Sequence, residues 1–154
     1  MVFSGLTKVK NSLFDLSVWQ SIKGVGKKGN MRVTVFNRDK FTKMGMGSFA
    51  GVAQGTNEPP KFIIMEYFGG SKKDKPVLLV GKGLTFDTGG ISLKPGLRMD
   101  EMKFDMCGSA VVFGAMNAIA TLKPKINVVA IVPSTHNMLG GSAVKPGDIL
   151  TAYN

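Results

Sequence analysis

The sequence predicts an α/β fold built on a mixed, largely parallel sheet with flanking helices. Three consecutive segments carry this prediction: an apolar strand at Val77–Val80, a helical pattern at Phe104–Leu122 and a second apolar strand at Ile126–Val132. Strand, helix and strand in this order form a βαβ unit, whose two strands run parallel with a right-handed crossover. Short, wholly apolar strands are typical of parallel sheets that are covered on both faces.

Length and composition narrow the class of protein. The chain has 154 residues, of which 44% are hydrophobic, and this favours one domain with a substantial core. The single cysteine, Cys107, excludes an intrachain disulfide, so we expect a reducing, cytoplasmic location. The apolar run Val128–Val132 is far shorter than the roughly 18–20 residues of a membrane span. Met1–Lys10 has no apolar segment of the secretory kind, and we expect no membrane partner.

The net charge of +10 comes from 20 Lys and Arg residues against 10 Asp and Glu residues. A basic protein can attract nucleic acids. Here the excess consists of scattered lysines without interleaved aromatic residues, which is typical of a solvated basic surface. We therefore expect no nucleic-acid partner; salt-sensitive retention of DNA or RNA would support the alternative.

The first third of the chain predicts two strands and a helix. Residues 1–29 match no pattern that assigns them, and we treat them as an unassigned N-terminal segment. Met31–Phe36 alternates apolar and polar residues and predicts a strand. A helix capped at Asn37 or Asp39 is expected to run on through Phe49, and a second strand follows at 62–67.

The second half predicts two long irregular segments around one helix. Gly81–Asp100 is rich in glycine, and long loops of this kind are often functional. The helix Phe104–Leu122 ends before Pro124, and the stretch Ser134–Asn154 reads as loop. One face of the helix is expected to be buried through Met106, Ala110, Phe113, Met116 and Ala120.

Four ionisable residues gather after the Val77–Val80 strand. In open parallel sheets, ligands bind beyond the carboxyl ends of the strands. Lys82, Asp87, Lys94 and Asp105 follow that end. Two lysines and two aspartates form either structural ion pairs or a site for a metal and an anion, and their spacing leaves both open.

The sequence motifs of this region resemble those of one protein family. The run V-G-K-G-L-T-F-D-T-G-G-I-S-L-K-P is similar to the signature of the leucyl (cytosol) aminopeptidases, as are M-D-E-M-K-F-D-M-C-G-S-A and the later I-N-V-V-A-I-V-P, N-M and A-V-K-P-G-D-I-L-T. The resemblance covers roughly Met31–Asn154. It implies that residues 30–154 form the first half of a leucyl-aminopeptidase-type catalytic domain.

The resemblance also implies an activity and the residues that carry it. Members of the family are hydrolases that release N-terminal residues from peptides with two adjacent divalent metal ions, and they form homohexamers. Matched by motif, Lys82, Asp87 and Asp105 resemble metal ligands. Lys94 resembles the catalytic lysine that holds the substrate carbonyl, and Met102 resembles a wall of the pocket for the first side chain.

Elementary chemistry agrees with these implied roles. Carboxylates suit Mn²⁺ and are acceptable to Zn²⁺. Lys82 can ligate only as a neutral amine, a form that burial and a nearby dication favour. Lys94 would stay charged and stabilise a developing oxyanion.

The family pattern continues with a further motif, N-T-D-A-E-G-R, which these 154 residues do not contain. That motif supplies further ligands and an arginine. We therefore expect at most one bound ion and a truncated chain that is weakly active or inactive. The alternative function is a catalytically dead remnant that acts as a subunit-binding module of an aminopeptidase oligomer.

Overall fold

The computed structural model describes Gly24, residues 31–141 and residues 145–146. The unassigned segment 1–29, apart from Gly24, and the end of the expected C-terminal loop therefore lie outside the described residues. The described elements follow one another in the order β1 (Arg32–Phe36), α3 (Arg38–Lys43), α4 (Gly47–Val52), η2 (Ala53–Gly55), β2 (Lys61–Phe68), β3 (Val77–Val80), β4 (Gly83–Asp87), η3 (Met99–Phe104), α5 (Cys107–Leu122) and β5 (Asn127–Asn137).

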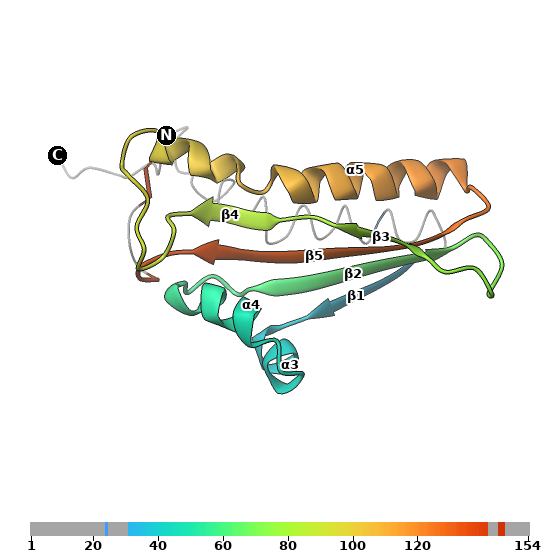
Figure 1. Ribbon diagram of the computed structural model, residues 1–154, viewed down its shortest axis with the longest axis horizontal. Coiled ribbons are helices and arrows are strands. Elements are labelled where there is room, and N and C mark those ends of the chain that lie inside the picture. Colours follow the sequence, from blue (N-terminus) through green and yellow to red (C-terminus); the bar gives the residue numbers. More distant parts are fainter. Residues whose placement is uncertain (1–23, 25–30, 142–144, 147–154) are drawn as a thin grey trace, which may run out of the picture.

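The five described strands form one mixed sheet, as predicted (Figure 1). β5 lies at its centre, antiparallel to β2 and parallel to both β3 and β4. β1 pairs antiparallel with β2. The two antiparallel and two parallel pairings divide the sheet evenly, so its parallel part is the β3–β5 and β4–β5 half. This half is the predicted βαβ unit, with α5 as its crossover.

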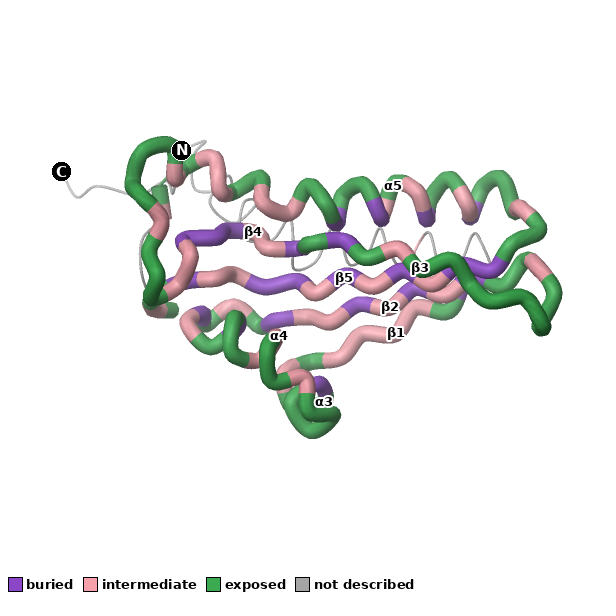
Figure 2. Tube along the Cα trace, viewed as in Figure 1, coloured by how far each residue is buried: buried purple, intermediate pink, exposed green. Residues whose placement is uncertain are grey.

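The core lies between α5 and one face of the sheet. Figure 2 shows the buried side of α5 turned toward the strands, with exposed residues on its outer side. Ile63, Met65 and Tyr67 of β2 pair with Val132, Ala130 and Val128 of β5 and so present alternate side chains to the same face. These side chains pack with Val112, Met116 and Ala120 of α5 in one buried cluster.

The expected single helix between β1 and β2 is two short helices. Gly45 has φ = +81°, a left-handed conformation that favours glycine and ends α3. The turn lets α4 fold back, so that Phe49 contacts both Phe41 of α3 and Phe62 of β2. An aromatic cluster therefore closes this end of the sheet.

The expectation that β3 is buried on both faces is wrong. Leu78 and Val80 are 58% and 65% exposed, whereas Leu79 packs against the core cluster. The reason is position: among the described strands β3 pairs only with β5, so it lies at an edge of the sheet. Its apolar composition is that of a covered strand, but α5 covers only the Leu79 side.

The two expected loops conceal a strand pair. Gly83–Asp87 forms β4, inside the segment predicted to be irregular, and β5 runs on to Asn137 rather than ending at Val132. These two extensions pair with each other, from Gly83↔Ser134 to Asp87↔Asn137. Polar residues and glycine interrupt the apolar pattern of both segments, so the sequence did not predict them as strands. Each segment pairs with a partner that lies some 50 residues away in the sequence.

The expected helix at Phe104–Leu122 begins three residues later, at Cys107, after the short helix η3. Met116 and Ala120 are buried as predicted. Phe113 also packs against the core, although it is only partly buried. Ala110 is exposed, and the N-terminal part of the buried face is instead Ser109 and Val112. Hydrogen bonds at Ser109 hold this end of the helix in place.

By length and composition, the stretch Met99–Leu122 is long and apolar enough to cross a membrane. The core helix of a globular domain meets the same test. Here one face of α5 packs on the sheet through Val112, Met116 and Ala120, and 22% of the apolar window is buried.

Candidate metal and substrate site

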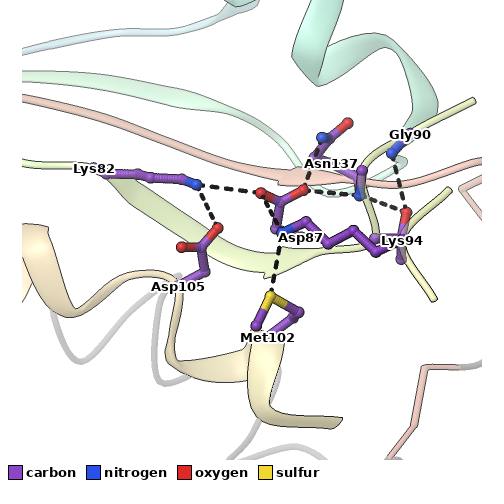
Figure 3. A network of polar contacts seen from close by, with 9 residues as sticks. Lys82, Asp87, Gly90, Lys94, Met102, Asp105 and Asn137 are labelled. Atoms are coloured by element: carbon purple, nitrogen blue, oxygen red, sulfur yellow. Dashed lines mark hydrogen bonds and ion pairs between the residues drawn. The ribbon is translucent and has the colours of Figure 1, made fainter. Parts of the chain in front are cut away.

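The four ionisable residues singled out in the sequence meet at the carboxyl end of β4 (Figure 3). Lys82 Nζ lies 2.6 Å from Asp105 Oδ2 and 3.2 Å from Asp87 Oδ2. Lys94 Nζ lies 3.1 Å from the same Asp87 oxygen. Two carboxylates and two amines therefore form one continuous network, at the edge of the sheet where open α/β folds bind ligands.

Lys82 occupies the break between β3 and β4, and the first turn of α5 holds it there. The Ser109 amide donates a 2.9 Å hydrogen bond to the Lys82 carbonyl. A Cβ on Gly81 would lie 2.7 Å from the Gly108 carbonyl oxygen, and one on Gly108 would lie 3.0 Å from the Lys82 nitrogen. The two glycines let helix and strand approach closely, which brings Asp105, just before the helix, next to Lys82.

Asp87 ends β4 and divides its partners between its two oxygens. Oδ1 accepts hydrogen bonds from the Gly89 amide at 2.9 Å and from Asn137 Nδ2 at 2.8 Å. Oδ2 faces the lysines Lys82 and Lys94. The Asp87 side chain is only 8% exposed. Oδ1 thus accepts hydrogen bonds from neutral N–H groups, and Oδ2 pairs with the two ammonium groups.

The Lys94 side chain reaches Asp87 Oδ2 from the loop that follows β4. The loop turns at Gly89 and Gly90, which have φ values of +92° and +73°, and the Lys94 amide donates to the Thr88 carbonyl at 2.9 Å. Its ammonium group also contacts the Met102 sulfur at 3.2 Å. Met102, from η3, therefore lies beside the amine that the sequence marks as catalytic.

The donor set fits a divalent cation. Asp105 Oδ2 is buried and receives no well-aligned hydrogen bond from the described residues, so its 2.6 Å contact with Lys82 is an ion pair rather than a hydrogen bond. A buried oxygen of this kind can accept a metal ion. The described part of the chain holds no cluster of three or more His, Cys, Asp or Glu side chains. The ligands on hand are two carboxylates and one amine.

The electrostatics of the site stabilise its charged forms. The Asp105 carboxylate, against the opposing effect of burial and with help from Asp87, raises the pKa of Lys82. Burial raises the pKa of Asp87, but interactions with Asp105, the Gly89 amide, Lys94 and Asn137 outweigh it and hold that pKa well below its usual range. Without a metal ion, Lys82 is thus an ammonium group, whereas the neutral amine expected of a metal ligand depends on a nearby dication. Two neighbouring carboxylates favour the charged form, and a dication would have to compete with that proton.

The structure brings together all five residues predicted for the site: Lys82, Asp87, Lys94, Met102 and Asp105. Their roles as ligands, catalytic lysine and pocket wall stay predictions. Sequence reasoning missed Asn137, which contacts Asp87 across 50 positions of sequence. It appears in the quoted N-M motif, but no local signal gives it a role.

Comparisons with known sequences agree with these motifs. The family described as cytosol aminopeptidase family, catalytic domain, matches residues 9–154, which includes part of the segment left unassigned. A probable cytosol aminopeptidase of Aromatoleum aromaticum is 59% identical over 130 residues, covering 84% of this chain and 26% of the relative. One from an Azoarcus species is 57% identical over 132 residues, covering 86% and 26%. The chain spans about a quarter of the length of these relatives.

Solved structures give the same answer for the fold. The bottromycin maturation enzyme BotP, in complex with Mn, superposes with a TM-score of 0.73 at 32% sequence identity, covering 90% of this chain and 30% of BotP. A second BotP structure gives a TM-score of 0.72. The ordered motifs, the α/β architecture and the family match converge, and the chain belongs to the cytosol aminopeptidase family, of whose catalytic domain it carries a part.

Proposed function

We propose that this chain contributes to a metal-dependent aminopeptidase that releases N-terminal amino acids, with a leucine-type preference, from peptides. The observation that carries the proposal is the meeting of Asp87, Asp105 and Lys82 around one point at the end of β4. Membership of the cytosol aminopeptidase family supports it. One buried and one partly buried carboxylate, Asp87 and Asp105, supply the oxygen ligands that divalent ions take in proteins.

In this proposal, Lys82, Asp87 and Asp105 hold a divalent ion, Mn²⁺ or Zn²⁺. When bound, the ion supplies Lewis-acid polarisation of the scissile carbonyl. The carboxylates suit both metals, and BotP, a structural relative, has been solved with Mn. With three protein ligands in this region, we propose a single, weakly held ion for the isolated chain.

Lys94 is proposed to bind the substrate carbonyl oxygen. Its ammonium group pairs with Asp87 and contacts the Met102 sulfur. Its side chain is 37% exposed, so it is open to a ligand while it is held in place. A positioned cation at this point stabilises negative charge that develops on the carbonyl oxygen. Met102 is proposed to border the pocket for the first side chain of the peptide.

The partners and location follow from the family. We propose peptide substrates, a homo-oligomer of the hexameric type, and a cytoplasmic site of action, since the relatives are named cytosol aminopeptidases. We propose neither nucleic acid nor membrane as a partner. For this length of chain, about a quarter of its relatives, we propose low turnover.

The test combines metal binding and turnover by the purified chain. Mn²⁺ binding is measured by titration calorimetry, and hydrolysis is measured with a leucine anilide, with and without Mn²⁺. We expect saturable binding of one ion that Asp87→Asn weakens at least tenfold. Any turnover should require metal and disappear in Lys94→Ala. Lys103→Ala is the matched control, because Lys103 is exposed and its ammonium group lies over the Phe104 ring. Absence of saturable Mn²⁺ and Zn²⁺ binding would contradict the proposal.

A further inference from the structure

Asn137, on β5, is a neutral side chain that hydrogen-bonds to the predicted metal ligand Asp87 on the neighbouring strand β4. Its Nδ2 donates a 2.8 Å hydrogen bond to Asp87 Oδ1, and the two residues are directly paired in the parallel β4–β5 ladder. The amide must present its nitrogen to Asp87, since an ionised carboxylate only accepts hydrogen bonds. In Figure 3, Asn137 approaches Asp87 from the side opposite Asp105 and Met102.

The Asn137 backbone is clamped to the residue after Asp87. The Asn137 carbonyl accepts hydrogen bonds from the Thr88 amide and from Thr88 Oγ1, each at 2.9 Å. Two bonds to one carbonyl fix the end of β5 against the end of β4. The amide of Asn137 therefore moves together with the backbone that carries Asp87.

Gly90 leaves the space that the Asn137 amide occupies. A Cβ on Gly90 would lie 2.9 Å from Asn137 Oδ1, and Gly90 itself has φ = +73°. The turn after Asp87 thus folds over the far side of the amide. The Asn137 amide thus lies between Asp87 and this turn.

These contacts give the two Asp87 oxygens different tasks. Oδ1 is occupied by two neutral N–H groups, from Gly89 and Asn137. Neutral donors orient a carboxylate without cancelling its charge, so Oδ2 keeps its negative charge for the cations Lys82 and Lys94. Without the Asn137 donor, the carboxylate could rotate about its Cβ–Cγ bond and share both oxygens with the lysines.

We propose that Asn137 is a positioning residue, which locks the Asp87 carboxylate so that Oδ2 alone faces the cation side of the site. This inference rests on the proposed function, in which Asp87 is a metal ligand. Partners that orient a ligand are generally worth 10–100-fold in metal affinity. Among the described residues of the site, the Asn137 amide donates to Asp87 and not to the lysines or Asp105, so its effect passes through Asp87.

The experiment measures Mn²⁺ affinity of the full chain by calorimetry or by the EPR signal of free Mn²⁺. Asn137→Ala removes the donor, and Asn137→Leu removes it while keeping the branched shape of the side chain. We expect either variant to bind Mn²⁺ about 10–100-fold more weakly. Asn117→Ala, at an exposed position on α5, is the matched control and should bind like the wild type. Wild-type affinity in both folded Asn137 variants would overturn the inference and leave the proposed function standing.

A second measurement examines the contact without metal. In NMR spectra of the metal-free chain, the Asn137 side-chain amide protons should exchange slowly with solvent and should lose this protection in Asp87→Ala. Failure of the wild type to bind Mn²⁺ would contradict the proposed function, and the amide protons would then decide the positioning role alone. Fast exchange in the wild type, or protection that Asp87→Ala leaves unchanged, would overturn it.

Discussion

Lys82 Nζ lies 2.6 Å from Asp105 Oδ2, and this ion pair joins the break between β3 and β4 to the start of α5. The two residues come from different elements, yet the close packing of Gly81 on the first turn of the helix brings their backbones together. The site is therefore a product of the strand–helix contact. A substitution that disturbs this contact should therefore change both the stability of the fold and the geometry of the site.

The Lys82–Asp105 pair should show a measurable coupling energy. Exposed ion pairs are worth about 0.2–1 kcal/mol. The Lys82 side chain is 51% exposed and that of Asp105 only 23%, so we expect a value at the upper end, about 1 kcal/mol. A double-mutant cycle with Lys82→Met and Asp105→Asn, measured by denaturant unfolding in metal-free buffer, gives this value. The exposed Arg98–Glu101 pair is the control and should give only a few tenths of a kcal/mol. Equal coupling in both pairs would contradict the expectation.

Ionisation of Asp87 should make the free energy of unfolding depend on pH. Its pKa is lowered in the folded state, so the unfolded chain binds its proton more readily. The stabilisation is then complete above the unfolded pKa of about 4 and is lost as pH falls below that value toward the folded pKa. We expect Asp87→Asn to lower the melting temperature at pH 7, and the gap to the wild type to narrow by pH 3.

The control for this acid effect is Asp74→Asn, at an exposed position, and both variants are measured by thermal unfolding in metal-free buffer. The wild type and Asp74→Asn should lose stability in parallel as the pH falls. A gap between Asp87→Asn and the wild type that stays constant from pH 7 to pH 3 would show that the Asp87 charge contributes nothing.

Gly81→Ala should destabilise the protein through overpacking. The new Cβ would lie 2.7 Å from the Gly108 carbonyl oxygen and 2.8 Å from Val112 Cγ2, and relieving this overlap costs about 1–3 kcal/mol. The matched control is Gly114→Ala on α5, where nothing lies within 4 Å. That change should stabilise the helix by about 0.5–1 kcal/mol. Thermal unfolding distinguishes the two, and a loss in Gly114→Ala equal to that in Gly81→Ala would contradict the packing argument.

The exposed face of β3 should promote self-association. Leu78 is 58% exposed on an edge strand, and apolar edge strands are sites of aggregation. Leu78→Lys should reduce light scattering of the concentrated protein without lowering its melting temperature. Leu79→Lys, one residue along and packed against the core, should instead lower the melting temperature by several degrees. Unchanged light scattering in Leu78→Lys would contradict the prediction that the exposed face of β3 promotes self-association.

Several features of this protein were predictable from local sequence alone. The strands β1, β2 and β3 and the body of α5 follow from hydrophobic periodicity, which depends on neighbours a few residues apart. The site residues Lys82, Asp87, Lys94 and Asp105 were found because they follow one strand end and stand in recognisable motifs. The parallel pairing of β3 with β5 follows from the strand–helix–strand order.

Tertiary structure decided what depends on partners distant in the sequence. The β4–β5 extension carries mostly polar residues, so only its pairing from Gly83↔Ser134 onward reveals it. The rotation of α5 depends on the bonds of Ser109 to Lys82 and Met106. The contact of Asn137 with Asp87 exists because two parallel strands end side by side. Periodicity reports which way a side chain points along its own element, but it carries no information about which distant element lies opposite.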